Sequence, residues 1–152
     1  MRIGSLSSGW LLALMAVTAE SATFTEKWSY ATSGAVYSSP AIDEAGNLYF
    51  GARDNRVYAV TSDGSALWTT PAYGDWIDTS PTLLPDGGLV VGSWDFSVYC
   101  FEQTTGALRW SYATGGAVTA SPAVGRGGRI FVASTDGTGT ALNPSDGSVR
   151  WT

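Results

Sequence analysis

Three aspartates, Asp54, Asp95 and Asp136, recur at intervals of 41 residues and are the groups in this chain whose spacing is most suggestive of chemistry. Carboxylates repeated at a fixed interval could supply oxygen ligands to a cation such as Ca²⁺, one from each repeat. The same side chains can instead accept hydrogen bonds from the backbone two residues further on and hold tight turns. Because each aspartate lies between two short apolar runs, we interpret all three as turn residues and keep a metal site as the alternative.

Other reactive groups are scarce in the sequence. There is no histidine, and the single cysteine, Cys100, allows no internal disulfide. Cys100 stands where the other repeats have Ala59 and Ala141, which indicates a small buried side chain rather than a reactive thiol. We therefore predict no catalytic, cofactor-binding or metal-binding residue.

One loop breaks the symmetry of the repeats. Trp76 stands where the other repeats have alanine, and Asp78 stands where they have Tyr37 and Thr119, at positions expected near the start of the innermost strand. Aromatic residues beside acids suit contact with a protein or a carbohydrate. The alternative, that Trp76 only fills space beside a neighbouring repeat, stays open. The candidate partner-binding residues are Tyr73, Asp75, Trp76, Asp78 and Trp94.

The elements that position these residues form a repeat. Four tryptophans stand 40, 42 and 41 residues apart, and three Ser-Pro pairs keep step with them. The structural repeat residues are Trp28, Trp68, Trp110, Trp151, Pro40, Pro81, Pro122, Asp54, Asp95 and Asp136. A fixed period in the forties built from short β-like runs is typical of a propeller, in which each repeat is one blade.

When the repeats are aligned on their prolines, each contains four predicted strands. The second and third strands, which are 48–51 and 57–60 in the first repeat, are apolar on both faces. The predicted fold is all-β: a partial β-propeller over residues 23–152, with about three four-stranded antiparallel blades at about 36–70, 77–112 and 118–152. The tryptophan closing each fourth strand is expected to pack between blades with its indole N–H on a backbone carbonyl.

The composition is that of a globular protein with many short strands: 44% apolar residues, 14% charged residues and 19 glycines. The formal net charge is −5, and the basic residues are scattered singly. Because nucleic-acid binding requires clustered basic residues, we predict no nucleic-acid partner.

The first 19 residues are predicted to be a signal peptide, with Arg2 followed by an apolar run of eight residues, 10–17, and small residues at 17–19. The run is shorter than the roughly 20 residues of a membrane span, and a buried first strand is the alternative. We expect an exported protein of the periplasm or cell envelope. No cysteine follows the run, so no lipid anchor is expected there, and no transmembrane span is expected in the mature chain.

The segment from Val98 to Trp110 resembles the repeat of the PQQ-like β-propeller family, whose consensus runs roughly Val-Tyr-Ala-Leu-Asp, two variable residues, Thr-Gly, three variable residues, Trp. The other repeats match through 57–68 and 141–151, and the resemblance covers residues 28–151. The consensus aspartate is replaced by Thr61, Glu102 and Asn143. The resemblance implies a propeller fold.

This family resemblance implies one of two kinds of function. Some members are quinoprotein dehydrogenases that hold pyrroloquinoline quinone and calcium; others are non-catalytic exported scaffolds, similar to the BamB-type component of outer-membrane protein assembly. The sequence lacks the cysteine pair and the carboxylate cluster of the dehydrogenases. We expect a non-catalytic scaffold for protein–protein interaction in envelope protein assembly, with no cofactor. The alternatives are a fragment of a quinoprotein dehydrogenase and a carbohydrate-binding envelope protein.

The strand count predicts an open ring. Residues 28–32 are identical to 110–114 and form an orphan fourth strand at the N-terminus. Since propellers have four to eight blades, we expect that further C-terminal blades, or self-association, are needed to close the ring.

Overall fold

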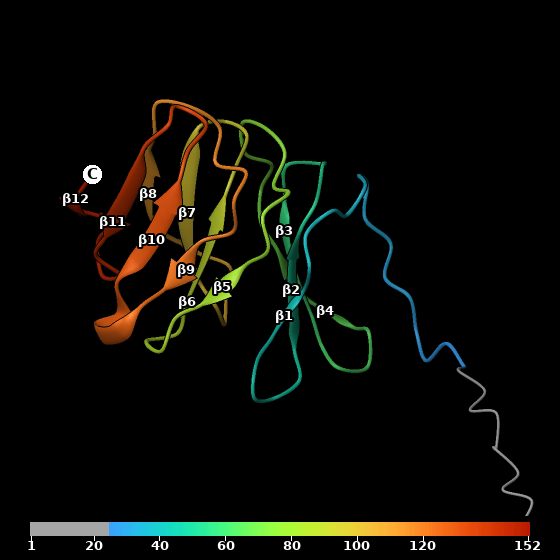
Figure 1. The fold of residues 1–152 in the computed structure, drawn as a ribbon. Helices are drawn as coiled ribbons and strands as arrows, with labels where there is room; N and C mark the ends of the chain where they lie inside the picture. The colour runs from blue at the N-terminus through green and yellow to red at the C-terminus, as the bar shows by residue number, and fades with distance from the viewer. Residues whose placement is uncertain (1–24) are drawn as a thin grey trace, which may run out of the picture.

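The computed structural model describes residues 25–152, so the predicted signal peptide lies outside the described residues. The chain forms three four-stranded antiparallel sheets (Figure 1), which confirms the predicted all-β, partial-propeller fold. The first sheet contains β1 Ala41–Ile42, β2 Leu48–Gly51, β3 Val57–Val60 and β4 Ala66–Thr69. The second contains β5 Thr82–Leu83, β6 Gly88–Gly92, β7 Ser97–Glu102 and β8 Leu108–Ala113. The third contains β9 Ala123–Val124, β10 Ile130–Ala133, β11 Gly139–Leu142 and β12 Val149–Trp151, with a short 3₁₀ turn, η1 Arg126–Gly128, between β9 and β10.

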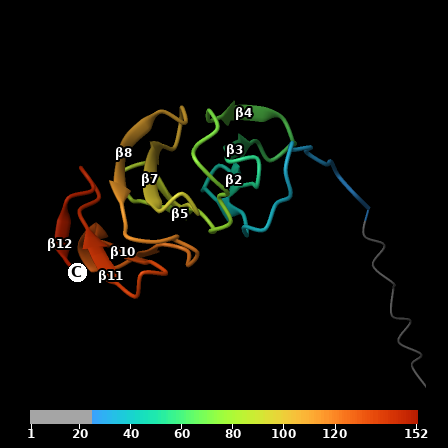
Figure 2. The same cartoon turned by 90° about the horizontal axis from the view of Figure 1, so that it is seen from above.

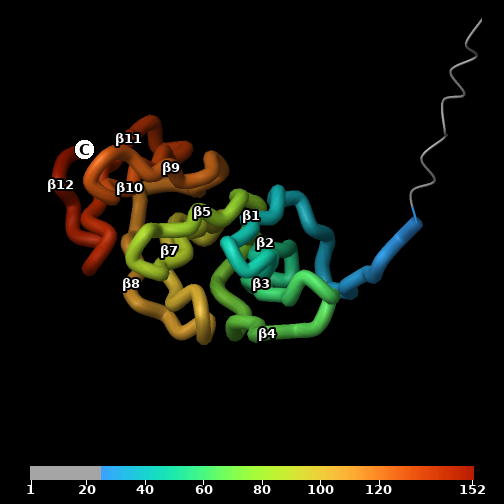
Figure 3. The backbone as a smooth tube through the Cα atoms, turned by 90° about the horizontal axis from the view of Figure 1, so that it is seen from below, coloured from blue at the N-terminus to red at the C-terminus, as the bar shows by residue number. Residues whose placement is uncertain are grey.

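The three sheets stand side by side in an arc. Their first strands, β1, β5 and β9, lie on the inner side of the arc, and their last strands, β4, β8 and β12, lie on the outer side (Figures 2 and 3). Consecutive strands pair within each sheet, so each repeat is one blade of a propeller. None of the helical segments in residues 25–152 is long and apolar enough to cross a membrane.

The core consists of the contacts between neighbouring blades. One buried cluster joins the first and second sheets and includes Tyr49, Ile77 and Phe101, and another joins the second and third sheets through Val90 and Ile130. The central strands are buried on both faces because alternate side chains enter the clusters on either side. This two-sided burial explains why these strands are continuous apolar runs rather than alternating ones.

The recurrent tryptophan of each blade packs against the next blade. The indole N–H of Trp68 donates to the Gln103 carbonyl at 2.9 Å, and that of Trp110 donates to the Pro144 carbonyl at 2.8 Å. Each ring lies over a turn glycine of the next blade, where a Cβ at Gly106 would lie 2.6 Å from the Trp68 ring and a Cβ at Gly147 would lie 2.6 Å from the Trp110 ring. Both glycines have a φ of +70°, so the turn requires glycine for its backbone conformation and for its space.

The N-terminal segment provides the same contact to the first blade. Trp28 donates its indole N–H to the Ser62 carbonyl at 2.9 Å and lies against Gly64. Trp28 and Tyr30 pack on a third cluster that contains Phe50 and Tyr58. Residues 25–32 are not in a strand, contrary to the sequence-based expectation, because a strand requires a hydrogen-bonded neighbour and none pairs with them among the described residues.

The Ser-Pro pairs connect the blades on the inner side of the arc. The Ser39 N–H donates to Oγ of Ser80, and the Ser80 N–H donates to Oγ of Ser121, both at 2.9 Å. The residue before each of the first two pairs bonds to the next strand through its side-chain hydroxyl instead of through its backbone. In the second blade, Thr79 Oγ1 accepts from the Gly92 N–H at 2.8 Å and donates to the Gly92 carbonyl at 2.9 Å. Residues 76–78 therefore form a loop, and β5 begins only after the proline, later than the sequence predicts.

Candidate functional site

The recurring aspartates sit in the hairpins between the second and third strands of each sheet. At Asp95, Oδ1 accepts the Ser97 N–H at 3.1 Å and Oδ2 accepts the Gly74 N–H at 3.1 Å. Asp136 accepts the Thr138 N–H and the Gly115 N–H, both at 2.8 Å. Each carboxylate thus links its hairpin to the loop that enters the same blade. We call this end of the sheets, formed by hairpins 52–56, 93–97 and 134–138 and the entering loops, the hairpin end.

The first repeat keeps only part of this pattern. Oδ2 of Asp54 accepts the Ser33 N–H at 3.1 Å and a hydrogen bond from the Tyr58 hydroxyl, while Oδ1 is buried without a hydrogen-bond partner. Among residues 25–152, no three His, Cys, Asp or Glu side chains lie close enough together to hold a metal ion. The hydrogen bonds of the hairpin aspartates favour their interpretation as turn residues.

Two tyrosines in the strands that follow these hairpins, Tyr58 in β3 and Tyr99 in β7, are expected to make the stability fall at alkaline pH. Burial, followed by a hydrogen bond to Asp54 or Asp95, raises the pKa of Tyr58 and of Tyr99 from 10.0 to about 12. The unfolded chain ionises these phenols near pH 10, whereas the folded chain keeps them neutral. We expect the free energy of unfolding to be unaffected by these phenols below pH 10 and to fall as the pH rises from 10 towards 12.

Denaturant titrations at a series of pH values test this expectation. Tyr99→Phe keeps the ring but removes its ionisation, so its free energy of unfolding should fall less steeply above pH 10 than that of the wild type. Identical slopes for the two proteins would contradict the proposed origin of the pH dependence.

The hairpin end carries an arginine held between two aromatic rings. The guanidinium carbon of Arg53 lies 3.8 Å from the centroid of the Tyr37 ring and 4.2 Å from that of Trp76. Nε and Nη2 of Arg53 donate to the Asp78 carboxylate at 3.1 and 2.9 Å. This ion pair, with the adjacent cation–π contacts, joins the first blade to the loop that enters the second.

Trp94 extends this arrangement from the neighbouring hairpin. Its ring meets Trp76 edge to face, with the centroids 5.9 Å apart. We call Tyr37, Arg53, Trp76, Asp78 and Trp94 the aromatic–arginine cluster. The aromatic rings remain open to solvent: Tyr37 is 64% exposed, Trp76 39% and Trp94 38%. Exposed aromatic side chains gathered at one end of the sheets are typical of contact surfaces in proteins.

The structure brings three of the five sequence-predicted candidates into this cluster, Trp76, Asp78 and Trp94. Asp75 is adjacent: its side chain accepts the Trp76 N–H at 2.8 Å, and its carbonyl accepts the Ser93 hydroxyl at 3.2 Å. Tyr73 lies elsewhere, partly buried against the core, with its ring 4.4 Å from the Tyr99 ring.

Tyr37 and Arg53 were not among the sequence-predicted candidates. A signal was available in the repeat alignment, because Tyr37 aligns with Asp78 and Thr119, while Arg53 aligns with Trp94 and Thr135. These are two of the positions at which the repeats differ most in chemical type, and both contribute to the cluster.

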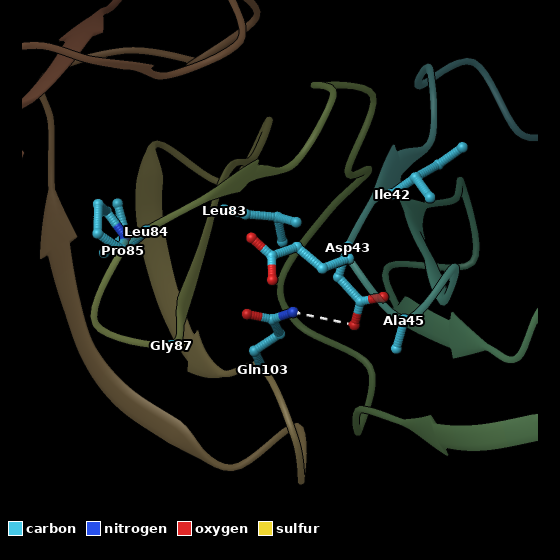
Figure 4. Close-up of a pocket in the computed structure, with 9 residues that line it drawn as sticks. Ile42, Asp43, Ala45, Leu83, Leu84, Pro85, Gly87 and Gln103 are labelled. Atoms are coloured by element: carbon cyan, nitrogen blue, oxygen red, sulfur yellow. Dashed lines mark hydrogen bonds between the residues drawn. The ribbon is translucent and has the colours of Figure 1, made fainter.

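The opposite end of the sheets has a cavity of about 620 Å³ between the first two blades (Figure 4). It is lined by residues 42–45, 83–85 and 87 and by Gln103, whose Nε2 donates to Oδ2 of Asp43 at 3.2 Å. Burial raises the pKa of Asp43, but hydrogen bonds from Asn47 and Tyr49 outweigh it and hold the pKa below the ordinary value. The Asp43 carboxylate is thus occupied by protein donors and links the two blades.

The open four-stranded antiparallel sheets, set in an arc and locked by recurrent tryptophans, define a β-propeller repeat protein. The model of the PQQ-like family described as outer membrane protein assembly factor BamB matches residues 53–152, and the chain belongs to this family. This confirms the resemblance found in the sequence.

Solved structures share the fold. BamB from Moraxella catarrhalis is 19% identical with a TM-score of 0.70, over 82% of this chain and 39% of that one, so the chain spans about two fifths of that protein. The computationally designed Ika4 protein is 20% identical with a TM-score of 0.73, over 85% of this chain and 79% of that one. The computationally designed Ika8 protein is 18% identical with a TM-score of 0.67, over 77% of this chain and 36% of that one. A search of curated protein sequences found no match.

Proposed function

We propose that this chain is a non-catalytic, exported propeller scaffold that binds a protein partner during the assembly of outer-membrane or other envelope proteins. Membership of the family described as outer membrane protein assembly factor BamB supports this role. The structural similarity to BamB supports the fold on which the role depends. The partner is bound at the hairpin end.

The observation that carries the proposal is the aromatic–arginine cluster. Tryptophan, tyrosine and arginine are the side chains most enriched at binding hot spots, where they combine a large apolar area with directed polar groups. Arg53 is already paired with Asp78, so the cluster presents ordered rings rather than mobile side chains. An ordered surface loses less conformational entropy when a partner binds.

Co-purification from detergent-solubilised envelope membranes tests this function. The wild-type chain should retain a β-barrel assembly component identified by mass spectrometry, and Trp76→Ala should reduce the retained amount by at least about tenfold, as for a hot-spot residue. Trp151→Ala is the matched control, because Trp151 is 53% exposed in the outer strand β12, away from the cluster.

Equal retention by the wild type and Trp76→Ala would contradict a role for the cluster. Retention of the chain on an envelope polysaccharide, lost in Trp76→Ala, would instead support the carbohydrate-binding alternative. Saturable, calcium-dependent binding of pyrroloquinoline quinone would support the dehydrogenase alternative.

A further inference from the structure

The hairpin end is acidic. Within residues 33–138, it carries five aspartates, Asp54, Asp75, Asp78, Asp95 and Asp136, and two arginines, Arg53 and Arg56. Both arginines are already engaged: Arg53 with Asp78, and Arg56 through an Nη1 hydrogen bond of 2.7 Å to the Thr70 carbonyl. The unbalanced charge at this end is therefore negative, and it attracts cationic groups.

The aromatic–arginine cluster shows how this surface accommodates a cation. Arg53 places its guanidinium against the faces of Tyr37 and Trp76, with a carboxylate completing the site. Trp94 continues the row of rings and has no cation within the described residues. Asp75 lies in the adjoining loop, where its carbonyl accepts the Ser93 hydroxyl at 3.2 Å and its Oδ1 accepts the Trp76 N–H at 2.8 Å. An exposed aromatic ring on an acidic surface attracts a cationic side chain.

The same hairpin also presents an apolar side chain in a costly backbone conformation. Phe96 has a φ of +70° and is 51% exposed. The equivalent positions are Asn55 and Gly137, which tolerate a positive φ, whereas a bulky residue there is strained. The second blade thus carries an exposed phenyl ring at a position where its own fold favours glycine or asparagine, which points to a contact outside the chain.

We propose that the hairpin end recognises a cationic segment of its protein partner, in which arginine or lysine side chains alternate with apolar ones. A cationic group binds against the Trp94 ring on this acidic end, and an apolar side chain packs on Phe96. This proposal rests on the proposed scaffold function and specifies the chemistry of its partner.

Two short synthetic peptides test the proposal with the full chain, one alternating arginine with leucine and the other alternating glutamate with leucine. The arginine peptide should bind at least about tenfold more tightly than the glutamate peptide at low salt, and its affinity should fall as salt is added.

Two variants test the individual contacts. Trp94→Ala should weaken binding of the arginine peptide by about fivefold, the size of one cation–π contact. Phe96→Gly should weaken binding while raising or preserving the melting temperature, because it relieves the positive-φ strain.

Charge-matched variants separate a specific site from general attraction to an acidic protein. Asp75→Asn removes a charge at the hairpin end, and Asp63→Asn removes one from the turn between β3 and β4 at the opposite end. Weakening by Asp75→Asn but not by Asp63→Asn supports the proposal. Equal effects of the two variants, equal binding of the two peptides, or no binding of the arginine peptide would overturn it. If these peptide tests fail while Trp76→Ala still reduces co-purification, the proposed partner chemistry is wrong and the scaffold function stands.

Discussion

Trp110→Ala is expected to lower the free energy of unfolding by about 3–5 kcal/mol, the usual cost of deleting a buried aromatic side chain. Trp110 is only 8% exposed and belongs to the cluster that joins the second and third blades. The substitution leaves a cavity against Gly147 and removes the donor to the Pro144 carbonyl. Because adjacent blades share this interface, the loss is not confined to one sheet.

Denaturant unfolding of the full chain measures this effect, read as a lower midpoint at an unchanged dependence on denaturant concentration. Trp151→Ala is the control at the equivalent repeat position, where the side chain is 53% exposed. It should change the free energy of unfolding by no more than about 0.5 kcal/mol. Equal losses for the two variants would show that the tryptophan does not act through the contact between blades.

The architecture was predictable because its determinants recur locally. Each repeat carries its own turn glycines, its own two-sided apolar strands and its own tryptophan, so three copies in register specify three four-stranded sheets. The bounds of the innermost strands were less predictable. Thr79 bonds to strand β6 through its hydroxyl rather than through its backbone, so the strand has not yet begun at this residue. The pattern of apolar residues gives no sign of a side-chain bond of this kind.

The candidate site was only partly predictable, because its defining contacts connect different repeats. Trp76 and Asp78 were identified since they break the repeat, but their common partner, Arg53, lies 25 residues before Asp78 in the preceding hairpin. Tyr37 reaches the same guanidinium from a third segment. Sequence spacing indicates neighbours within a blade, whereas these side chains meet only because two blades pack side by side. Tyr73, which lies in the same loop as Trp76, packs into the core instead.

A large destabilising effect is expected from adding a single methyl group at Gly92, at the end of strand β6. A Cβ there would lie 2.8 Å from Cβ of Val118, closer still to its Cγ1, and 3.1 Å from its carbonyl oxygen. Val118 is fully buried between the second and third blades, so it cannot move aside without shifting the loop that enters the third blade. We expect Gly92→Ala to cost about 1–3 kcal/mol, as overpacking of a close-packed interior does.

Gly139→Ala makes the same chemical change at the start of strand β11, where the nearest atom to a new Cβ is the Val132 carbonyl oxygen at 4.0 Å. Neither glycine has a positive φ, so backbone strain does not separate the two variants. Alanine at 139 should be neutral or stabilising by up to about 1 kcal/mol, because it restricts the unfolded chain. The third repeat already has alanine, Ala133, at the position of Gly92, and it is exposed there. Glycine is thus required where the strand packs against the loop that enters the next blade. Equal melting temperatures for Gly92→Ala and Gly139→Ala would contradict this cause.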